Sequence, residues 1–196
     1  MDLFTATVLE GETVRLEPLH PRHFDNLCAV GIDADLWQIS LTPMQTSQEL
    51  LAYLNEALQE AKNQASVPFA IVHRQSGKAI GSSRFANISP QHRRLEIGWT
   101  WIAKEWQRTA VNTETKYLML RHAFEQLSLN RVEFKTDALN ERSRKAILRI
   151  GAKEEGTLRG HMVTSGGRIR DTVYYSILAP DWPAVKAGLE QKMRCA

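Results

Sequence analysis

Cysteine is scarce in this chain, where only Cys28 and Cys195 occur among 196 residues. The two lie far apart in the sequence and show no ligand-like spacing. We therefore expect neither a disulfide framework nor a zinc site, and no metal is predicted. Few, unpaired cysteines are typical of a reducing compartment, which predicts a cytoplasmic protein.

Long apolar runs and blocks of like charge are also missing. No segment approaches the roughly 20 apolar residues of a membrane helix, and the first residues lack the basic and apolar segments of a secretion signal. The 25 basic and 22 acidic residues give a net charge of only +3. We therefore expect a mixed, solvated surface, with neither a membrane nor nucleic acid as a partner.

The rest of the composition is ordinary for a folded chain, with 43% apolar and 24% charged residues. A length of 196 residues allows one sizeable core and is short for two domains. No repeat, low-complexity block or linker interrupts the sequence. A single domain over residues 1–196 is predicted, with its core over about residues 10–179.

Apolar periodicity predicts a mixed sheet flanked by helices, in the α/β class. Three strand connections are short enough for hairpins, which excludes an all-parallel sheet. Strands are expected at residues 13–19, 67–74, 79–88, 94–102, 131–137, 154–164 and 168–178, and helices at 21–30, 46–64, 112–128 and 140–150.

Residues 99–112 carry the strongest functional signal. They predict a buried strand that runs through a short basic loop into a helix, with Asn112 as the N-cap. Free loop amides and the helix dipole at such a turn favour a phosphate group. A second polar helix opening, at residues 140–143, follows the next strand. Together the two openings indicate a phosphate-bearing cofactor with a reaction beside it.

Four short stretches stand out, which are VRLEPL at 14–19, LEIGW at 95–99, QRTAVNTE at 107–114 and TDALNERS at 136–143. In this order and spacing they resemble the GNAT superfamily of acyl-CoA-dependent N-acetyltransferases. The resemblance is strongest to the Rim-type branch, which acetylates ribosomal-protein N-termini, and it covers about residues 10–179. It implies a GNAT-like acyl-CoA N-acyltransferase fold with a splayed central sheet, and acetyl-CoA as cosubstrate.

The resemblance places the cofactor pyrophosphate at residues 107–113, where the superfamily pattern is commonly Gln/Arg-x-x-Gly-x-Gly/Ala. Gln107 fits the first position. Ala110 stands where glycine is usual, and Asn112 stands where glycine or alanine is usual. A Cβ at Ala110 is expected to weaken binding rather than abolish it. The backbone of the preceding strand would hold the pantetheine arm. The predicted cofactor residues are Trp101, Ile102, Gln107, Arg108, Thr109, Ala110, Val111, Asn112, Thr113 and Asn140.

Glu96 is the candidate general base. It lies in a predicted central strand between Leu95 and Ile97, where partial desolvation suits a carboxylate to such work. It would take a proton from the acceptor amine directly or through water. A structural ion pair with a neighbour such as Arg84 or Arg94 is the competing interpretation.

Ser143 is the candidate acid that protonates the departing thiolate, a role implied by the resemblance to the Rim-type branch. Many superfamily members have a tyrosine four residues further on, where this chain has Ile147. A polar residue in a first helical turn is the competing interpretation of Ser143. Asn140 either caps the helix or bonds the pantetheine amide, and both alternatives stay open.

The predicted reaction moves an acetyl group from acetyl-CoA to a primary amine by direct attack in a ternary complex. A protein N-terminus is a candidate acceptor, because an α-amino group with a pKa of about 8 is partly neutral near pH 7. Acceptor choice is expected from residues 31–45, with Trp37 as pocket wall or core anchor, and from the closing hairpin. A homodimer is compatible with the family. A CoA-binding sensor or interaction module with little catalysis is the alternative, suggested by Ala110 and the absent tyrosine.

Overall fold

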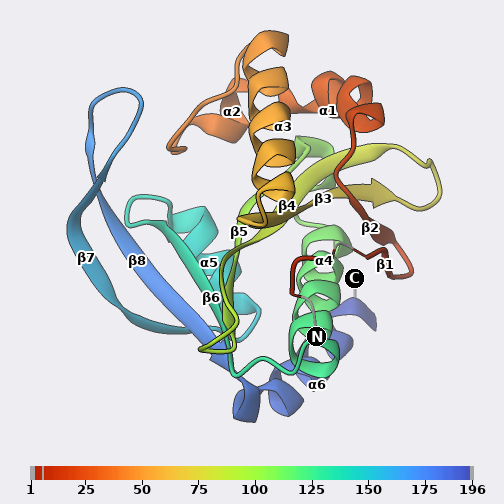
Figure 1. The fold of residues 1–196 in the computed structure, drawn as a ribbon, viewed down its shortest axis with the longest axis vertical. Coiled ribbons are helices and arrows are strands. Elements are labelled where there is room, and N and C mark those ends of the chain that lie inside the picture. Colours follow the sequence, from red (N-terminus) through yellow and green to blue (C-terminus); the bar gives the residue numbers. More distant parts are fainter. Residues whose placement is uncertain (1–2, 6, 195–196) are drawn as a thin grey trace.

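The computed structural model describes residues 3–5 and 7–194, which form an eight-stranded sheet in the order β1-β2-β3-β4-β5-β6-β8-β7 (Figure 1). The β5–β6 pair is parallel and every other neighbouring pair is antiparallel, so the predicted mixed sheet is confirmed. The strands are β1 Leu9–Glu10, β2 Val14–Pro18, β3 Ser66–His73, β4 Ala79–Ser89, β5 Arg94–Ile102, β6 Arg131–Asp137, β7 Lys153–Val163 and β8 Ile169–Leu178.

Helices cover the two faces of the sheet unequally (Figure 1). On one face α4 (Ala110–Arg121), α5 (Glu141–Arg149) and α6 (Trp182–Arg194) pack over the larger core. On the other face α1 (Phe24–Gly31), α2 (Ala34–Trp37) and α3 (Ser47–Lys62) enclose a smaller core against β3, β4 and the end of β5. Among the described residues, that smaller core includes no side chain of β6, β7 or β8. The second face is therefore covered at one half of the sheet only.

Local sequence explains where the long helix α3 begins. Thr46 has extended backbone angles and accepts a hydrogen bond from the Glu49 amide, while the Glu49 side chain accepts one from the Thr46 amide. This reciprocal arrangement satisfies two of the free N–H groups of the first turn. Leu50, Leu54 and Ala57 then recur at helical spacing and are buried against the sheet.

The sequence prediction missed one strand and two α-helices, which are β1, α2 and α6. The predicted helix over 112–128 also differs, because α4 spans Ala110–Arg121 and is followed by a π-helical turn at His122–Gln126. Of the two cysteines, Cys28 is free and Cys195 lies outside the described residues.

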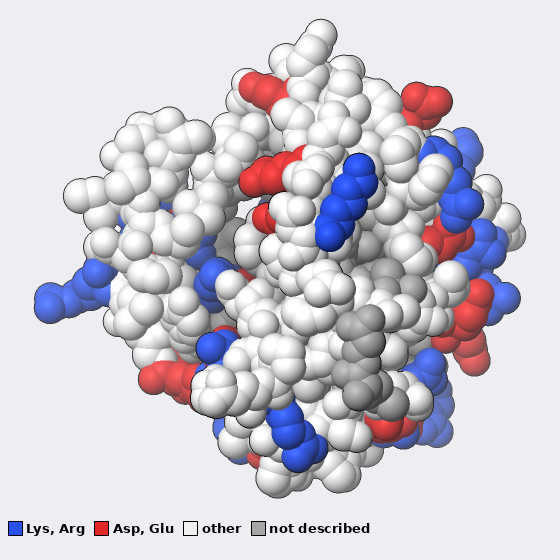
Figure 2. Space-filling model, viewed as in Figure 1, with Lys and Arg blue, Asp and Glu red and all other residues white. Residues whose placement is uncertain are grey.

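The uncovered half of the second face is a hollow. Figure 2 shows it between the lobe formed by the β7–β8 hairpin and the part of the molecule that carries α3, with basic and acidic side chains around it. A hydrogen bond of 3.1 Å from the Ser165 amide to the Leu41 carbonyl joins the hairpin tip to the loop before α3. The two segments expected to choose the acceptor therefore meet above this hollow, which we call the polar cleft.

Candidate active site

The central strands β5 and β6 separate in the middle of the sheet. They pair only as far as Glu96, which lies opposite Glu133. Beyond this point β5 continues to pair with β4 and β6 with β8. β5 also bulges, because Trp99 has a φ of +50° and the register against β4 shifts there. The splay implied by the family resemblance is thus present, and Glu96 stands at its apex.

Glu96 is held by one carboxylate oxygen only. Its Oε2 accepts a hydrogen bond from Asn87 Nδ2 at 2.7 Å and lies 3.0 Å from Lys135 Nζ. Its Oε1 faces Gly98, where an added Cβ would stand 2.8 Å from it. Within the described residues, Oε1 accepts no hydrogen bond. Glu96 is 3% exposed, and one oxygen of its carboxylate remains available to accept a hydrogen bond beside the splay.

The ion-pair partners considered for Glu96 were wrong. Arg84 pairs with Glu60 at 2.8 Å and Arg94 pairs with Glu133 at 3.2 Å, while the partner of Glu96 is the lysine on β6. Both arginines find these other carboxylates because of the faces and registers of their strands, which the sequence alone does not give.

Trp99 stands between two cations on the bulge of β5. The Arg84 guanidinium lies 5.1 Å from its ring centroid and Lys135 Nζ lies 5.7 Å from it. Arg84 also lies 4.9 Å from the ring of Tyr53 on α3. Such cation–π contacts stabilise the ring position, although Trp99 is 43% exposed. The exposed indole therefore forms a fixed wall of the polar cleft beside Glu96.

The loop before α4 has its unusual backbone two residues earlier than the family pattern suggests. Arg108 is left-handed, with a φ of +62°, whereas Ala110 already lies in the helix with an ordinary φ. A non-glycine residue at positive φ carries a strain of about 1 kcal/mol, and here that strain belongs to Arg108. The Cβ of Ala110 therefore introduces no backbone strain.

The N-cap of α4 is Thr109, so the prediction of Asn112 was wrong. Thr109 Oγ1 accepts a hydrogen bond from the Val111 amide at 3.3 Å and donates one to the Trp106 carbonyl at 2.8 Å. Asn112 lies in the first turn, followed by Thr113. Threonine and asparagine both cap helices, and the extended backbone at Thr109 decides between them.

Several amides at this helix start remain free. Within the described residues, the backbone N–H groups of Arg108, Thr109 and Ala110 have no acceptor. They lie at the positive end of the α4 dipole. Arg142, at the start of α5, donates a hydrogen bond of 3.3 Å to Gln107 Oε1 and brings a second guanidinium to the loop. Free amides, a helix N-terminus and two arginines are a set of donors that suits a diphosphate.

Trp101 and Ile102 close β5 with buried side chains that enter the two opposite cores. Their backbone pairs with β4, while β6 has already diverged on the other side. The Ile102 carbonyl accepts a hydrogen bond of 2.9 Å from Gln107 Nε2, so this oxygen has a partner within the chain. The contact of these two residues with a pantetheine arm stays a prediction.

The start of α5 places the second candidate catalytic residue. Asn140 Oδ1 accepts a hydrogen bond from the Ser143 amide at 3.0 Å, so its side chain acts as the helix cap. Ser143 is half-buried in the first turn, and its hydroxyl has no partner among the described residues. Ile147 is buried in the larger core, so nothing at that position could serve as an acid.

Trp37 has the geometry of a core anchor. It is 9% exposed, and its Nε1 donates a hydrogen bond of 2.8 Å to the Gly31 carbonyl. Its ring centroid lies 5.6 Å from that of Trp101, within the smaller core. A direct contact with substrate stays a prediction for this residue.

The sequence did not single out the two residues that contact Glu96, which are Asn87 and Lys135. Lys135 had a usable signal, because residues 131, 133, 135 and 137 of β6 are all charged and therefore share one face. Asn87 had none, because its side chain reaches Glu96 through a left-handed backbone with a φ of +48° and a break in the β4–β5 register.

Two further features bear on what the site can bind. Across the described ranges, no group of three or more His, Cys, Asp or Glu side chains is arranged to hold a metal ion. Nor does any helix in the described part combine the length and apolarity needed to cross a membrane.

A mixed sheet that splays at its centre, with an amide-lined loop at the end of β5 and a polar cleft over the splay, defines the fold class of the N-acetyltransferases. The family description "Acetyltransferase (GNAT) domain" matches residues 13–153. The chain therefore belongs to the GNAT family, whose members are acetyl-CoA-dependent N-acetyltransferases.

Individual relatives agree with this assignment. The chain is 37% identical over 110 residues to YdaF of Bacillus subtilis, which is named provisionally as a ribosomal N-acetyltransferase; the match covers 56% of this chain and 59% of YdaF. A crystal structure of a GCN5-related N-acetyltransferase from Brucella melitensis has a TM-score of 0.88 at 32% identity, covering 95% of this chain and 85% of that one.

A third relative extends the comparison of the fold. Mycobacterium smegmatis RimJ, solved in complex with CoA-disulfide, has a TM-score of 0.77 at 22% identity, with 95% of this chain and 92% of that chain covered. At this identity the likeness concerns the fold alone.

Proposed function

We propose that this protein transfers the acetyl group of acetyl-CoA to a primary amine, and that its acceptor is the α-amino group of a peptide or amino acid. One observation carries the proposal: Glu96, at the apex of the splay, keeps Oε1 beside Gly98 without a hydrogen-bond partner among the described residues. The family relation supports the donor, and the name of YdaF supports a protein N-terminus as acceptor.

The residues present fit a CoA diphosphate at the start of α4. The free amides of Arg108, Thr109 and Ala110 would hold it, assisted by Arg142, and the backbone end of β5 would hold the pantetheine arm. Bound in this way, acetyl-CoA supplies the acetyl thioester. Because the left-handed residue is Arg108 rather than Ala110, the backbone objection to binding at Ala110 does not apply.

The chain would supply two proton-transfer groups. Glu96 Oε1 takes a proton from the attacking amine, directly or through one water, while Asn87 and Lys135 hold Oε2. Ser143 Oγ gives a proton to the leaving sulfur. An α-amino group needs only a weak base near neutral pH, because its pKa of about 8 lies well below that of lysine.

The experiment is an acetylation assay with labelled acetyl-CoA and panels of peptides, amino acids and polyamines. Glu96→Gln and Ser143→Ala are each expected to lower kcat by about 10²- to 10⁴-fold, with CoA affinity by calorimetry unchanged. Glu56→Gln, an exposed change on α3, is the matched control. No transfer to any amine, together with tight CoA binding, would favour the alternative of a CoA-binding module, which the buried Ile147 in place of an acid also supports.

Localisation and assembly belong to the same proposal. The free Cys28 is compatible with a reducing cytoplasm, and a homodimer is compatible with the family. Sedimentation of the purified protein tests the second statement directly.

A further inference from the structure

Arg170 on β8 is a buried arginine whose guanidinium makes no hydrogen bond within the described residues. It is 7% exposed, and its Nε has no partner. Burial lowers its pKa from the ordinary value, which reflects the unfavourable desolvation of the cation. A buried guanidinium with unused donors is destabilising unless an anion completes it.

The nearest carboxylate does not complete it. Asp137 Oδ2 lies 4.0 Å from Arg170 Nε, beyond hydrogen-bond distance, and is bonded instead to Arg168. Asp137 Oδ1 accepts a hydrogen bond from the Leu139 amide at 3.0 Å. Burial raises the pKa of Asp137, but Arg168, this amide and the charge of Arg170 outweigh burial and lower it overall. The carboxylate is therefore ionised and gives its hydrogen bond to Arg168 rather than to Arg170. Arg170 is therefore left in a long ion pair, and its buried Nε donor has no hydrogen-bond acceptor among the described residues.

A second unused donor lies beside the first. Thr172 is fully buried, and its Oγ1 has no partner among the described residues. It follows Arg170 by two positions on β8, so the two side chains share one face of the strand. Thr172 pairs with Asp137 on β6, and Lys135 precedes Asp137 by two positions on that same face. This face of the sheet leads from Arg170 to Lys135 and its partner Glu96.

We infer that Arg170 and Thr172 form a subsite for a carboxylate of the acceptor. The planar guanidinium fork matches a carboxylate, and the threonine hydroxyl can donate to it. The inference rests on the proposed function, because the same acceptor must bring its amine to Glu96. The acceptor is thus a primary amine with a carboxylate nearby: either a free amino acid, or a peptide with an acidic residue close to its N-terminus.

The test compares acceptors that differ only in charge. Peptides with Asp or Glu at the first or second position are paired with their Asn or Gln counterparts, and free amino acids with their amides. The wild type is expected to prefer the carboxylate form by about 10- to 100-fold in kcat/KM, the range of one charged hydrogen-bonded contact. Whether free amino acids or peptides show this preference identifies the source of the carboxylate.

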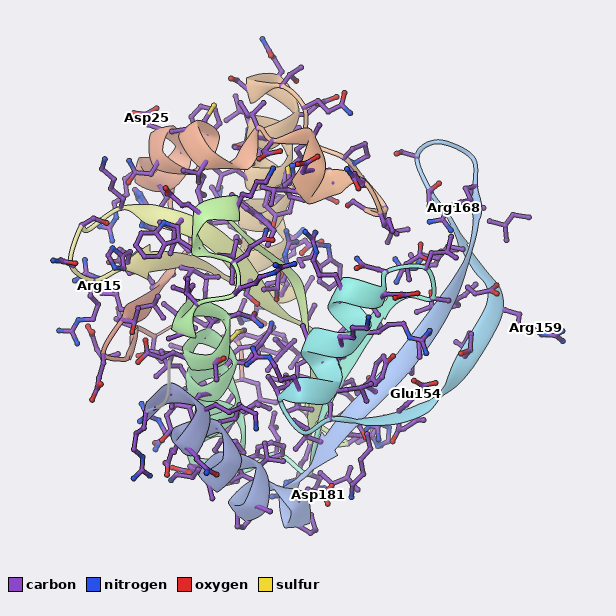
Figure 3. The ribbon with its side chains drawn as sticks, turned by 180° about the vertical axis from the view of Figure 1, so that it is seen from behind. Arg15, Asp25, Glu154, Arg159, Arg168 and Asp181 are labelled. Atoms are coloured by element: carbon purple, nitrogen blue, oxygen red, sulfur yellow. The ribbon has the colours of Figure 1, made fainter. Side chains whose placement is uncertain are left out.

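Two variants and one control assign the preference to the subsite. Arg170→Gln is expected to abolish the preference, because kcat/KM for the carboxylate acceptors falls to the level of their neutral counterparts. Thr172→Val keeps the side-chain shape and is expected to lower the preference by a few-fold. Arg159→Gln makes the same charge change on β7, where the side chain points away from the molecule (Figure 3), and is expected to change nothing.

Separate outcomes distinguish the inference from the proposed function. If neutral acceptors are acetylated and the wild type shows no carboxylate preference, or if Arg170→Gln keeps it, the subsite is overturned and the function stands. If no acceptor is turned over, calorimetry with CoA and the same peptide pairs replaces the assay. Equal or absent binding of both peptides then overturns the subsite, whereas tighter binding of the carboxylate form that is lost in Arg170→Gln supports it. Melting temperatures of all variants identify any that fail to fold.

Discussion

Lys116 on α4 donates a hydrogen bond to Thr100 Oγ1 on β5, which places an amine in the interior beneath the bulge. Thr100 Oγ1 also lies 2.7 Å from Ser83 Oγ, so buried Lys116 and Ser83 are linked through the half-buried Thr100. Burial lowers the pKa of Lys116 to about 7.

This pKa predicts a pH-dependent stability. The unfolded chain holds the Lys116 proton up to a pKa of about 10.4, so between pH 7 and 10 it binds more protons than the folded chain. Stability therefore rises with pH across this window, and the full penalty for the charge applies below it. Lys116→Met is expected to be more stable than the wild type at pH 7 by about 1–3 kcal/mol, with the difference shrinking toward pH 10.

Urea unfolding at a series of pH values measures this difference. Lys145→Met, an exposed lysine on α5, is the control and is expected to show no such trend. A difference between Lys116→Met and the wild type that stays constant with pH would contradict the prediction.

Substitution of Gly98 by alanine is expected to lower activity without unfolding the protein. An added Cβ would stand 2.8 Å from Glu96 Oε1, the oxygen proposed to take the proton, while the φ of Gly98 is accessible to other residues. Gly98→Ala is therefore expected to lower kcat by about 10- to 100-fold, with little change in CoA affinity. Gly166→Ala, where an added Cβ meets nothing within 4 Å, is the matched control. Activity equal to the wild type would show that Oε1 does not need this space.

Substitution of Ala110 by glycine is expected to leave the affinity for CoA unchanged. Because Ala110 lies in α4 with an ordinary φ, Ala110→Gly relieves no strain and is expected to leave the Kd within about twofold of the wild type. It is also expected to lower stability by up to about 1 kcal/mol, since glycine is the poorer helix former. Calorimetry and thermal unfolding measure the two quantities. A tenfold gain in affinity would mean that the Cβ itself obstructs the diphosphate.

Removal of the Glu114 carboxylate is expected to cause a large loss of stability. Its carboxylate is buried and accepts hydrogen bonds from the amides of Glu12, Thr13 and Val14, at 2.6, 2.8 and 2.7 Å, which ties α4 to the start of β2. Glu114→Ala leaves these donors without their acceptor and is expected to destabilise the fold by about 3 kcal/mol or more. Chemical unfolding measures this loss, with Glu56→Ala as the exposed control. A change below about 1 kcal/mol would assign the binding of β2 to its apolar contacts instead.

Much of this fold follows from periodicity. The alternation of Leu95 and Ile97 with polar residues predicts β5, and the spacing of Leu50, Leu54 and Ala57 predicts α3; both are confirmed. The mixed sheet follows from hairpin-length connections. The terminal helix α6 escaped prediction, because its buried side chains Trp182 and Leu189 are few for its length and are recognised only once they pack on α4.

The candidate site was predictable in its residues and much less in their partners. Glu96 could be named from its place in a predicted central strand, and Ser143 from the resemblance to the Rim-type branch. The Glu96–Lys135 pair depends on the registers of two strands that are neighbours in space and separated by a helix in sequence. The location of the left-handed residue at Arg108 likewise depends on how the loop enters α4, which no single side chain in the loop determines.

The pairing of β5 with β6 as far as Glu96 and no further gives the protein a mechanical character. The two halves of the sheet share backbone hydrogen bonds along a short segment of β5 and β6, and the two strands diverge beyond it. A ligand that hydrogen-bonds to both diverging strands would add bridging contacts between the two halves. The melting temperature would then rise with the fraction of protein that has acetyl-CoA bound, and it would report how completely the two halves are bridged.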